Sequence, residues 1–352
     1  MNEQDINPIY DVIIVGAGPS GSAASKAISD KGHSVLLIEK KKLPRYKICS
    51  GIIFIKSLEI TEKYFGTIPD SAFVSPPYLK GVRMWDSDGK STDWPFKTDE
   101  KGAPNVWRSE YDNWLAQNSG AQIVDQCRAV GFTQSGNNLE VRCIRNNIPV
   151  NVKCRFLISA EGSSSTIRAK LDPEFENNLD KFFAYQNYYE GHCNLDPLYY
   201  HGFLDENFGD IYAWFNVKDD LLVFGTGIKV GNKIKPYLEK FQRFLEENHD
   251  MKLNKMVRKA SCIGYNMCST NQFYLGKDNI LLVGESAGFL NMFGEGISSA
   301  LSTGLLAGNA VCGSFRSGKN AASSYNDAAQ KEMKYTSTSW KLAERMAGRK
   351  VI

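Results

Sequence analysis

The chain has 352 residues and a net charge of +3, from 42 Lys and Arg against 39 Asp and Glu. This near balance gives no reason to expect a nucleic-acid partner. The length suits one large domain or two closely joined domains, and the 42% hydrophobic content predicts a sizeable core.

The N-terminal residues and the cysteines bear on compartment and metals. The first residues, MNEQDINPIY, lack the features of a secretory signal, and no apolar run reaches the roughly 18 residues of a spanning helix. The eight cysteines form no CxxC pair, so we expect no zinc or other metal site. A cytoplasmic protein with reduced thiols is the expectation.

The first predicted unit is a strand, a glycine-rich loop, a helix and a second strand. Residues 12–15 form a continuous apolar run typical of a buried parallel strand, and a Gly-x-Gly-x-x-Gly loop follows at once. The first glycine permits a tight turn, the second lets the backbone approach a pyrophosphate, and the third lets helix and strand pack closely. Glu39, which ends the second strand, is placed to accept hydrogen bonds from ribose hydroxyls.

The residues of this unit predicted to bind a nucleotide are Gly16, Gly18, Pro19, Ser20, Gly21, Glu39 and Lys40. Free amides at the start of the helix would hold the phosphate charge. The alternative is a glycine-rich turn in another α/β fold. The pattern alone does not separate FAD from NAD.

Three later segments carry further polar loops beside predicted strands and helices. The first segment has Arg108 before a predicted helix. The second has Glu161-Gly162 after a predicted strand at 156–159. The third has Gly284-Glu285 after a predicted strand at 280–283, followed by Gly294-Glu295-Gly296 at the start of a long predicted helix of small residues. Amides at the start of this last helix would place partial positive charge beside a bound cofactor. The alternatives are a solvated Arg108, and glycines at 294 and 296 that serve only close helix packing.

The order of these motifs resembles the FAD-dependent monooxygenase and geranylgeranyl reductase superfamily, with the p-hydroxybenzoate hydroxylase type of fold. The resemblance covers most of the chain and implies FAD as cofactor. It also implies further cofactor contacts at Arg108, Ala160, Glu161, Gly162, Gly284, Glu285, Gly294, Gly296 and Ile297. Two motifs depart from the family because Glu161 and Glu285 stand where Asp is usual. The loop at 289–293 also lacks the proline common before the family's Gly-Glu-Gly.

The segment PRYKICSGII, at 44–53, resembles a PRxKxCGG-like segment that lies along the flavin in geranylgeranyl reductases. The match implies cofactor contacts from Arg45, Cys49, Ser50 and Gly51. Cys49 is the predicted catalytic thiol near flavin and substrate. The alternative is a small buried residue without a chemical role.

A second segment, YAWFNVKDDLLVFGTG at 212–227, resembles the reductases' YxWxFP…GxG element, with Asn216 and Val217 in place of the expected residues. Tyr212 and Trp214 are the predicted catalytic aromatic pair, facing a cavity on a strand. The alternative for both is ordinary sheet core.

The expected fold is α/β: a GxGxxG Rossmann-like FAD-binding domain with an inserted, mostly antiparallel substrate domain. A hairpin at 81–96 and an aromatic-rich region at 182–214 are typical of that insertion. The expected bounds are 1–75, 100–175 and 262–330 for the FAD domain, 76–99 and 176–261 for the substrate domain, and 331–352 for a C-terminal helical tail. The tail, expected as one or two helices, has Lys341, Arg345, Arg349 and Lys350 near its end. It is expected to be a solvated helix, with docking on a membrane surface as the alternative.

The leading functional hypothesis is hydride transfer from reduced FAD to a carbon–carbon double bond of an isoprenoid-like or other apolar substrate. No second dinucleotide motif is visible, so NAD(P)H would react transiently, and a ferredoxin-type donor protein is the other possible reductant. The loop that contains Lys40, Lys41 and Lys42 is expected to be solvated, and it could attract an acidic donor protein. The alternatives are an FAD monooxygenase or halogenase acting on an aromatic or polyketide-like compound, and a non-catalytic flavin redox partner.

Overall fold

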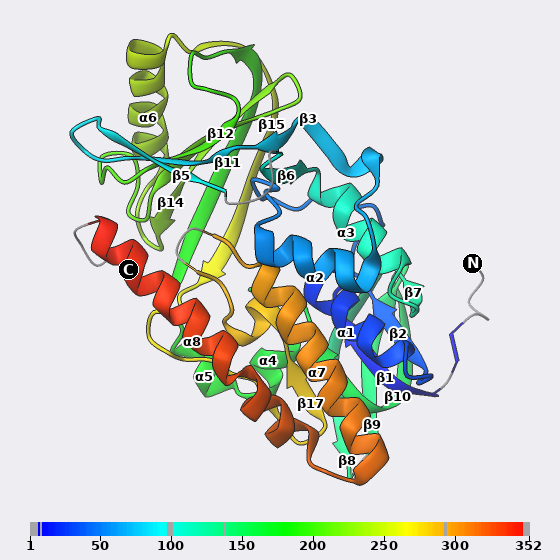
Figure 1. Cartoon of the computed structure of the whole chain (residues 1–352). Coiled ribbons are helices and arrows are strands. Elements are labelled where there is room, and N and C mark those ends of the chain that lie inside the picture. The colour runs from blue at the N-terminus through cyan, green and yellow to red at the C-terminus, as the bar shows by residue number, and fades with distance from the viewer. Residues whose placement is uncertain (1–5, 8, 97–100, 137, 292–293, 348–352) are drawn as a thin grey trace.

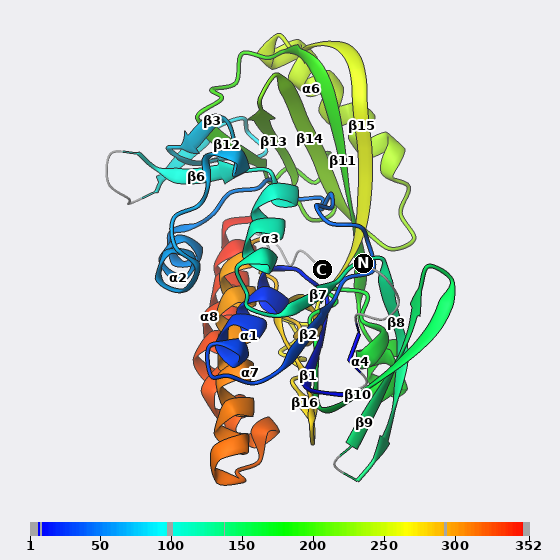
Figure 2. The same cartoon turned by 90° about the vertical axis from the view of Figure 1, so that its right-hand side faces the viewer.

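The computed structural model describes residues 6–7, 9–96, 101–136, 138–291 and 294–347. Two β-sheets lie end to end, and helices cover one face of the first sheet (Figure 1). Turned by 90°, the molecule shows α1, α7 and α8 on one side of this sheet and β8 and β9 on the other (Figure 2). The site described below lies where the two sheets meet.

The first sheet has a parallel core in the order β17-β10-β1-β2-β7, with β16 antiparallel at one edge. β8 and β9 form an antiparallel extension beside β10. Its strands are β1 (Ile9–Val15), β2 (Val35–Ile38), β7 (Gln122–Val124), β8 (Cys127–Ser135), β9 (Asn138–Arg145), β10 (Ile148–Ser159), β16 (Gly276–Lys277) and β17 (Ile280–Leu282). The apolar runs that predicted parallel strands are buried here, because helices cover one face and the β8–β9 layer covers the other.

The helices of this part are α1 (Pro19–Ser29), α2 (Ile55–Phe65), α3 (Arg108–Gln117), α4 (Thr166–Leu171), α5 (Pro173–Asn177), α7 (Ile297–Ser317) and α8 (Ala321–Ala347), with single 3-10 turns at Asp70–Ala72 and Gly284–Ala287. Small residues of α7 let it lie directly against α1. A β-carbon on Gly304 would lie 2.3 Å from the carbonyl oxygen of Ser20. The small-residue helix predicted from sequence therefore packs its backbone against the helix that follows the glycine loop.

The second sheet has the order β15-β11-β14-β13-β12-β4-β5 and is antiparallel except where β12 pairs with β4. Its strands are β4 (Gly81–Trp85), β5 (Ser91–Pro95), β11 (Lys181–His192), β12 (Tyr199–Phe203), β13 (Ala213–Lys218), β14 (Leu221–Lys229) and β15 (Lys252–Tyr265), and a small separate sheet pairs β3 (Phe73–Leu79) with β6 (Ala103–Val106). The predicted α/β fold with an added, mostly antiparallel sheet is confirmed. The predicted domain bounds stay a prediction.

Alternation along β13 decides which side chains reach the site. Ala213 and Phe215 pack in a cluster with Phe241 and Leu245 of α6 (Ile234–His249). Trp214, between them, points to the opposite face of the sheet because side chains alternate along a strand. Asn216 and Lys218 continue that face toward the end of β13.

The C-terminal segment is one long helix, α8, which begins at Ala321 and therefore well before the predicted tail. Tyr325 donates a hydrogen bond to the carbonyl of Leu282 at 3.0 Å, which fixes α8 to the edge of the parallel sheet. Trp340, near the other end of α8, is buried in a cluster with Tyr212 and Trp214. Arg349 and Lys350 lie outside the described residues. Across the described part of the chain, every helix is too short or too polar to cross a membrane.

Candidate active site

A cavity of about 650 Å³ lies between the ends of the parallel strands and the second sheet. Residues from all the sequence motifs line it. Of the predicted site residues, those in its wall are Gly16, Gly18, Pro19, Ser20, Glu39, Lys40, Arg45, Cys49, Ser50, Arg108, Ala160, Glu161, Gly162, Tyr212, Trp214, Glu285, Gly294, Gly296 and Ile297. The structure thus brings together motifs that lie far apart in the sequence, from Gly16 to Ile297.

Three of the predicted residues stand behind this wall. A β-carbon on Gly21 would lie 1.9 Å from the carbonyl oxygen of Gly16, so Gly21 permits the loop to close on the helix. Gly51 and Gly284 both have positive φ, at +83° and +59°. They shape the turns that present their neighbours to the cavity, because L side chains rarely adopt that conformation.

The glycine loop lies directly against the second motif. Gly16 has φ +109°, and a β-carbon there would lie 2.2 Å from the carbonyl oxygen of Ala160. Gly18 precedes α1, and Pro19 is the first residue of the helix. The loop therefore exposes backbone rather than side chain to the cavity, at the positive end of a helix dipole.

Glu39 lies beside this loop and is held by three donors. Its Oε2 accepts from the amide of Ala17 at 3.2 Å and from Nε of Arg45 at 2.9 Å, and its Oε1 accepts from the amide of Lys41 at 3.0 Å. A carboxylate has about four acceptor positions, so one remains for a ribose hydroxyl.

Arg45 crosses from Glu39 to α3. Its Nη1 donates to Oδ2 of Asp112 at 3.2 Å, and its Nη2 donates to the carbonyl of Ala17 at 3.2 Å. Asp112 is fully buried and also receives Nε and Nη2 of Arg108, at 2.7 and 2.9 Å. The alternative of a solvated Arg108 is wrong, because this side chain is 8% exposed and forms a buried ion pair. Sequence reasoning missed Asp112, which anchors both arginines.

Glu161 lies in the cavity wall, and its carboxylate is held by donors at the start of α4. Its carboxylate accepts from the hydroxyls of Ser159 and Ser165, at 2.9 and 2.7 Å, and from the amides of Thr166 and Ile167. It therefore caps the start of α4, where helix amides lack partners. The extra methylene that distinguishes Glu from Asp supplies this reach. Direct contact of Glu161 with a cofactor stays a prediction.

Arg168 joins the second and third motifs, a role that sequence reasoning did not assign. This fully buried guanidinium donates to the carbonyls of Ser163 at 2.7 Å and Ser286 at 2.8 Å, and pairs with Glu176 at 2.7 Å. The hydroxyl of Ser286 also accepts from the amide of Gly162 at 2.9 Å. The two loops therefore form one rigid piece of the cavity wall. A β-carbon on Gly162 would lie 3.6 Å from Oε2 of Glu285, which faces it.

Cys49 lies in the wall beside two cations. Burial alone would raise the pKa of its thiol, but Arg108, the amide of Gly51 and Lys218 together lower that pKa below its ordinary value. The amide of Gly51 is 3.4 Å from its sulfur. By contrast, burial raises the pKa of Cys262, which lines the same cavity, to about 11. Cys49 is thus the more acidic of these two cavity thiols.

Aromatic side chains form the wall on the second sheet. Tyr212 and Trp214 have ring centroids 5.6 Å apart, and Nε1 of Trp214 donates to Oε1 of Gln186 at 2.8 Å. Gln186 bonds in turn to the hydroxyl of Tyr188. The hydroxyls of Tyr200 and Tyr212 lie 3.2 Å apart. Both predicted aromatic residues thus line the cavity while packing in a core cluster, and their catalytic role stays a prediction.

The start of α7 completes the wall on the opposite side. A β-carbon on Gly294 would lie 3.6 Å from the hydroxyl of Tyr212, so this loop approaches the aromatic wall. Glu295 accepts from the amide of Ser298 at 2.9 Å and caps α7, and burial raises the pKa of Glu295. Met292 and Phe293, in the loop noted for its missing proline, lie outside the described residues.

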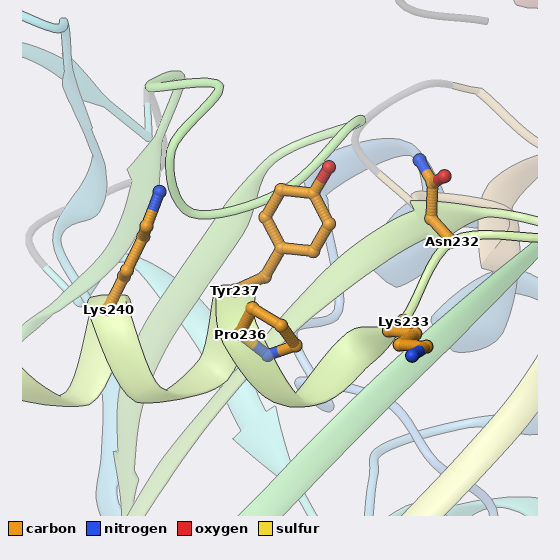
Figure 3. Close-up of a pocket in the computed structure, with 5 residues that line it drawn as sticks. All are labelled: Asn232, Lys233, Pro236, Tyr237 and Lys240. Carbon is orange, nitrogen blue, oxygen red and sulfur yellow. The ribbon is translucent and has the colours of Figure 1, made fainter.

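A second, more open hollow lies at the start of α6 (Figure 3). It is lined by Asn232, Lys233, Pro236, Tyr237 and Lys240. Asn232 and Tyr237 both donate to the carboxylate of Asp210, at 2.8 and 3.1 Å. No predicted site residue lines this hollow, and its exposed lysines are suitable control positions for charge-removing substitutions.

The residues of the large cavity fit FAD. Glycine backbone faces it at Gly16, Gly18 and Gly162, Glu39 retains an open acceptor position, and the wall ends at a helix start and an aromatic pair. Backbone amides suit a pyrophosphate, the acid suits a ribose, and apolar rings suit a flavin and its substrate.

Comparison with known proteins agrees with this geometry. A family described as NAD(P)-binding Rossmann-like domain matches residues 14–44. Digeranylgeranylglycerophospholipid reductase of Methanococcus vannielii is 30% identical over 327 residues, which cover 88% of this chain and 78% of that protein. Protein CbrA of Escherichia coli K12 is 25% identical, over 83% of this chain and 81% of its own.

Solved structures share the fold. A geranylgeranyl bacteriochlorophyll reductase-like protein from Thermoplasma acidophilum superposes with a TM-score of 0.83 at 20% identity, covering 97% of this chain and 89% of its own. A triple mutant of the flavin-dependent brominase Bmp2 gives a TM-score of 0.73 at 17% identity, over 93% and 86% of the two chains.

Fold, site and the 30% identical Methanococcus relative together define an FAD-dependent oxidoreductase with a Rossmann-like cofactor domain. Within that class, the identity and coverage shared with the Methanococcus enzyme place this chain in the geranylgeranyl reductase family. The predicted family, cofactor and enzyme class are confirmed.

Proposed function

We propose that this chain reduces carbon–carbon double bonds in a prenyl chain or a similarly apolar substrate. The observation that carries the proposal is that Cys49 lines the same cavity as the aromatic pair Tyr212 and Trp214. The printed name of the Methanococcus relative, a reductase of a geranylgeranyl lipid, supports the substrate class. The wall also includes apolar side chains suited to a hydrocarbon, namely Phe182, Ala184, Ile211, Ile263 and Leu290.

When bound, reduced FAD supplies a hydride, which carries two electrons to one carbon of the double bond. The other carbon needs a proton. The Cys49 thiol supplies it: the S–H bond breaks, a C–H bond forms, and a thiolate remains that takes a new proton from water. Arg108, beside Cys49, stabilises the thiolate. The aromatic wall orients the apolar chain and excludes water.

The test is an anaerobic single-turnover reaction of the reduced holoenzyme with a geranylgeranyl-bearing lipid in detergent. Oxidation of the flavin is followed by absorbance, and the product by mass spectrometry. Addition of two hydrogens per double bond is expected. Flavin oxidation only in the presence of oxygen, with a hydroxyl or halogen in the product, would overturn the proposal in favour of the monooxygenase or halogenase alternative. The brominase likeness makes that alternative worth testing, although at 17% identity it speaks for the fold alone.

The physiological electron donor is proposed to be an acidic protein of the ferredoxin type or NAD(P)H acting transiently. Exposed basic residues flank the cavity on its nucleotide side, namely Lys40, Lys41 and Arg128. Such a rim attracts an acidic partner over a distance of about a Debye length. Flavin reduction by a ferredoxin-type protein that slows steeply with added salt would support the protein donor, whereas salt-independent reduction by NAD(P)H would support the nucleotide.

Peripheral contact with a membrane is part of this proposal, because a prenyl lipid resides in a bilayer. The outer face of α8 presents four exposed basic residues together with two exposed apolar ones: Lys331, Lys334, Lys341, Arg345, Tyr335 and Leu342. This arrangement is typical of a helix that lies on an anionic surface.

Vesicles of phosphatidylglycerol and phosphatidylcholine test the membrane contact. Changing the four basic residues of α8 to Gln is expected to abolish co-sedimentation. The matched control changes four lysines elsewhere to Gln, namely Lys233, Lys235, Lys240 and Lys252, two of which appear in Figure 3. Equal loss in both variants would indicate a general charge effect and contradict a docking role for α8.

A further inference from the structure

Lys218 is a buried lysine at the end of β13, and its surroundings lack the usual partner of such a group. It is 1% exposed. Among the ion pairs formed by the described residues, none includes Lys218. A buried ammonium without a carboxylate partner is unfavourable, because no ion pair offsets the loss of its hydration. The packing and hydrogen bonding around Lys218 must therefore compensate for the unfavourable desolvation of its ammonium.

The contacts of Lys218 lead to the loop that carries Cys49. Its Nζ donates to the carbonyl of Val106 at 2.7 Å and lies 4.5 Å from the ring centroid of Trp107. The amide of Val106 donates to the carbonyl of Gly51 at 2.9 Å. A single peptide segment at the end of β6 thus joins the lysine to the turn at residues 49–51.

Gly51 shows how closely the ammonium approaches this turn. A β-carbon on Gly51 would lie 2.4 Å from Nζ of Lys218 and 2.1 Å from the carbonyl oxygen of Val106. Any side chain at position 51 would displace the ammonium. The sulfur of Cys49 lies against the amide of the same Gly51, at 3.4 Å. Sulfur and ammonium therefore flank one glycine.

We propose that Lys218 is a positioning residue for Cys49: its buried ammonium fixes the turn at residues 49–51 and stabilises the thiolate that remains after the thiol gives up its proton. Lys218 does not line the cavity, so it acts through Cys49 rather than on substrate. For the proton transfer itself the inference rests on the proposed function. The electrostatic pairing of sulfur and ammonium does not, and can be measured without substrate.

The charges around the pair are consistent with this role. Asp219, next along the chain, is exposed, and its carboxylate accepts from the amide of Ser75 and from Nε1 of Trp107, both at 2.8 Å. Burial lowers the pKa of Lys218 to about 8, with Cys49 and Asp219 opposing that decrease and Arg108 adding to it. Five other titratable groups that interact electrostatically with Cys49 are uncharged at neutral pH: Tyr46, Tyr188, Tyr200, Tyr212 and Cys262. Lys218 and Arg108 are therefore the cations that act on this sulfur.

Alkylation of the holoenzyme tests the proposal. Iodoacetamide reacts with thiolates, so the rate at Cys49, followed by mass spectrometry of its peptide from about pH 5 to about pH 9, reports the thiolate fraction. In the Lys218→Met variant we expect the midpoint to move to higher pH and the rate at neutral pH to fall roughly tenfold, as for a change of about one pKa unit. Lys218→Arg keeps the charge and should restore the midpoint. Cys262 in the same cavity and a Lys240→Met variant on α6 serve as controls.

Each result of the alkylation experiment either supports or overturns the proposed role of Lys218. An unchanged Cys49 profile in a flavin-loaded Lys218→Met variant would overturn the proposal. If that variant does not fold, the unaltered protein decides, because a Cys49 midpoint at or above the ordinary thiol value of about 8.5 would also overturn it. A shifted midpoint together with no reduction of any prenyl lipid would refute the proposed function and leave the pairing of Lys218 with Cys49 intact. In the active enzyme, Lys218→Met should lower kcat and move its alkaline limb to higher pH.

Discussion

Arg45 and Glu39 form an ion pair of 2.9 Å beside the glycine loop, and the same guanidinium reaches Asp112 of α3. One side chain therefore connects the acid that follows β2, the backbone of the loop and the helix that carries Arg108. This connection gives the arginine of the PRYKICSGII segment a structural role, because it ties the segment to the glycine loop and to α3.

Arg45→Met should weaken FAD binding by about 10- to 150-fold, since loss of a charge-assisted hydrogen bond is worth roughly 1.5–3 kcal/mol. Titration of the apoprotein with FAD, followed by quenching of flavin fluorescence, measures the change. Arg243→Met, at an exposed position on α6, is the control. Equal affinities in the two variants would show that Arg45 does not organise the nucleotide end.

Cys49→Ala should leave the yellow cofactor bound while lowering kcat by about 10²–10⁴, the usual contribution of a positioned proton donor. The absorbance spectrum of the purified variant checks cofactor content, and single-turnover reduction of the lipid checks the rate. Cys262→Ala, in the same cavity, should retain activity because that thiol is a poor acid. Unchanged turnover in Cys49→Ala would return Cys49 to a packing role.

Arg168→Met should lower the free energy of unfolding by about 3–5 kcal/mol, because Glu176 and two loop carbonyls would lose their buried donor. Denaturant titration measures this loss. Arg155→Met is the matched control: its side chain is exposed and its pair with Asp11 is 3.7 Å long, so a change within about 1 kcal/mol is expected. A loss equally small at Arg168 would contradict its role in joining the two loops.

His201 should make the fold sensitive to acid. Its Nδ1 accepts from Nε1 of Trp85 at 3.2 Å and its Nε2 contacts the carbonyl of Asp196 at 2.9 Å, so the neutral ring fits its site. Burial lowers the pKa of His201 to about 4. The unfolded chain therefore binds the proton first, and the folded protein loses stability as pH falls from about 6.5 to about 4, by about 3 kcal/mol in total.

Urea titrations across that range test the assignment. Carboxylates titrate in both proteins, so the difference between the unaltered chain and His201→Gln isolates the histidine. A shallower dependence on pH is expected in the variant. Parallel curves would show that His201 is not the group responsible.

The sequence predicted those parts of the site that local pattern determines. The glycine loop, the strand before it and Glu39 follow from contiguous residues whose conformations are set by short-range geometry. The meeting of Cys49 with Tyr212 and Trp214 followed from resemblance, since no local rule relates residues so far apart.

What sequence reasoning missed depends on side-chain direction or on long-range contacts. Glu161 turns into the start of α4 because a carboxylate one methylene longer reaches the free amides there, and residue type alone does not fix that rotamer. Asp112, Lys218 and Gln186 acquire their roles from partners on other elements. The helical tail at 331–352 stays a prediction with the other domain bounds, and the helix that contains it, α8, begins at Ala321.

The position of Trp340 bears on the wall that a substrate would contact. Its buried indole stands behind Tyr212 and Trp214, yet it belongs to α8 and not to either sheet. Under the proposed function, the aromatic wall that would receive a hydrocarbon is therefore backed by the last helix as well as by the strands. A different C-terminal helix would then alter the packing behind that wall while leaving in place the described residues that line the cavity.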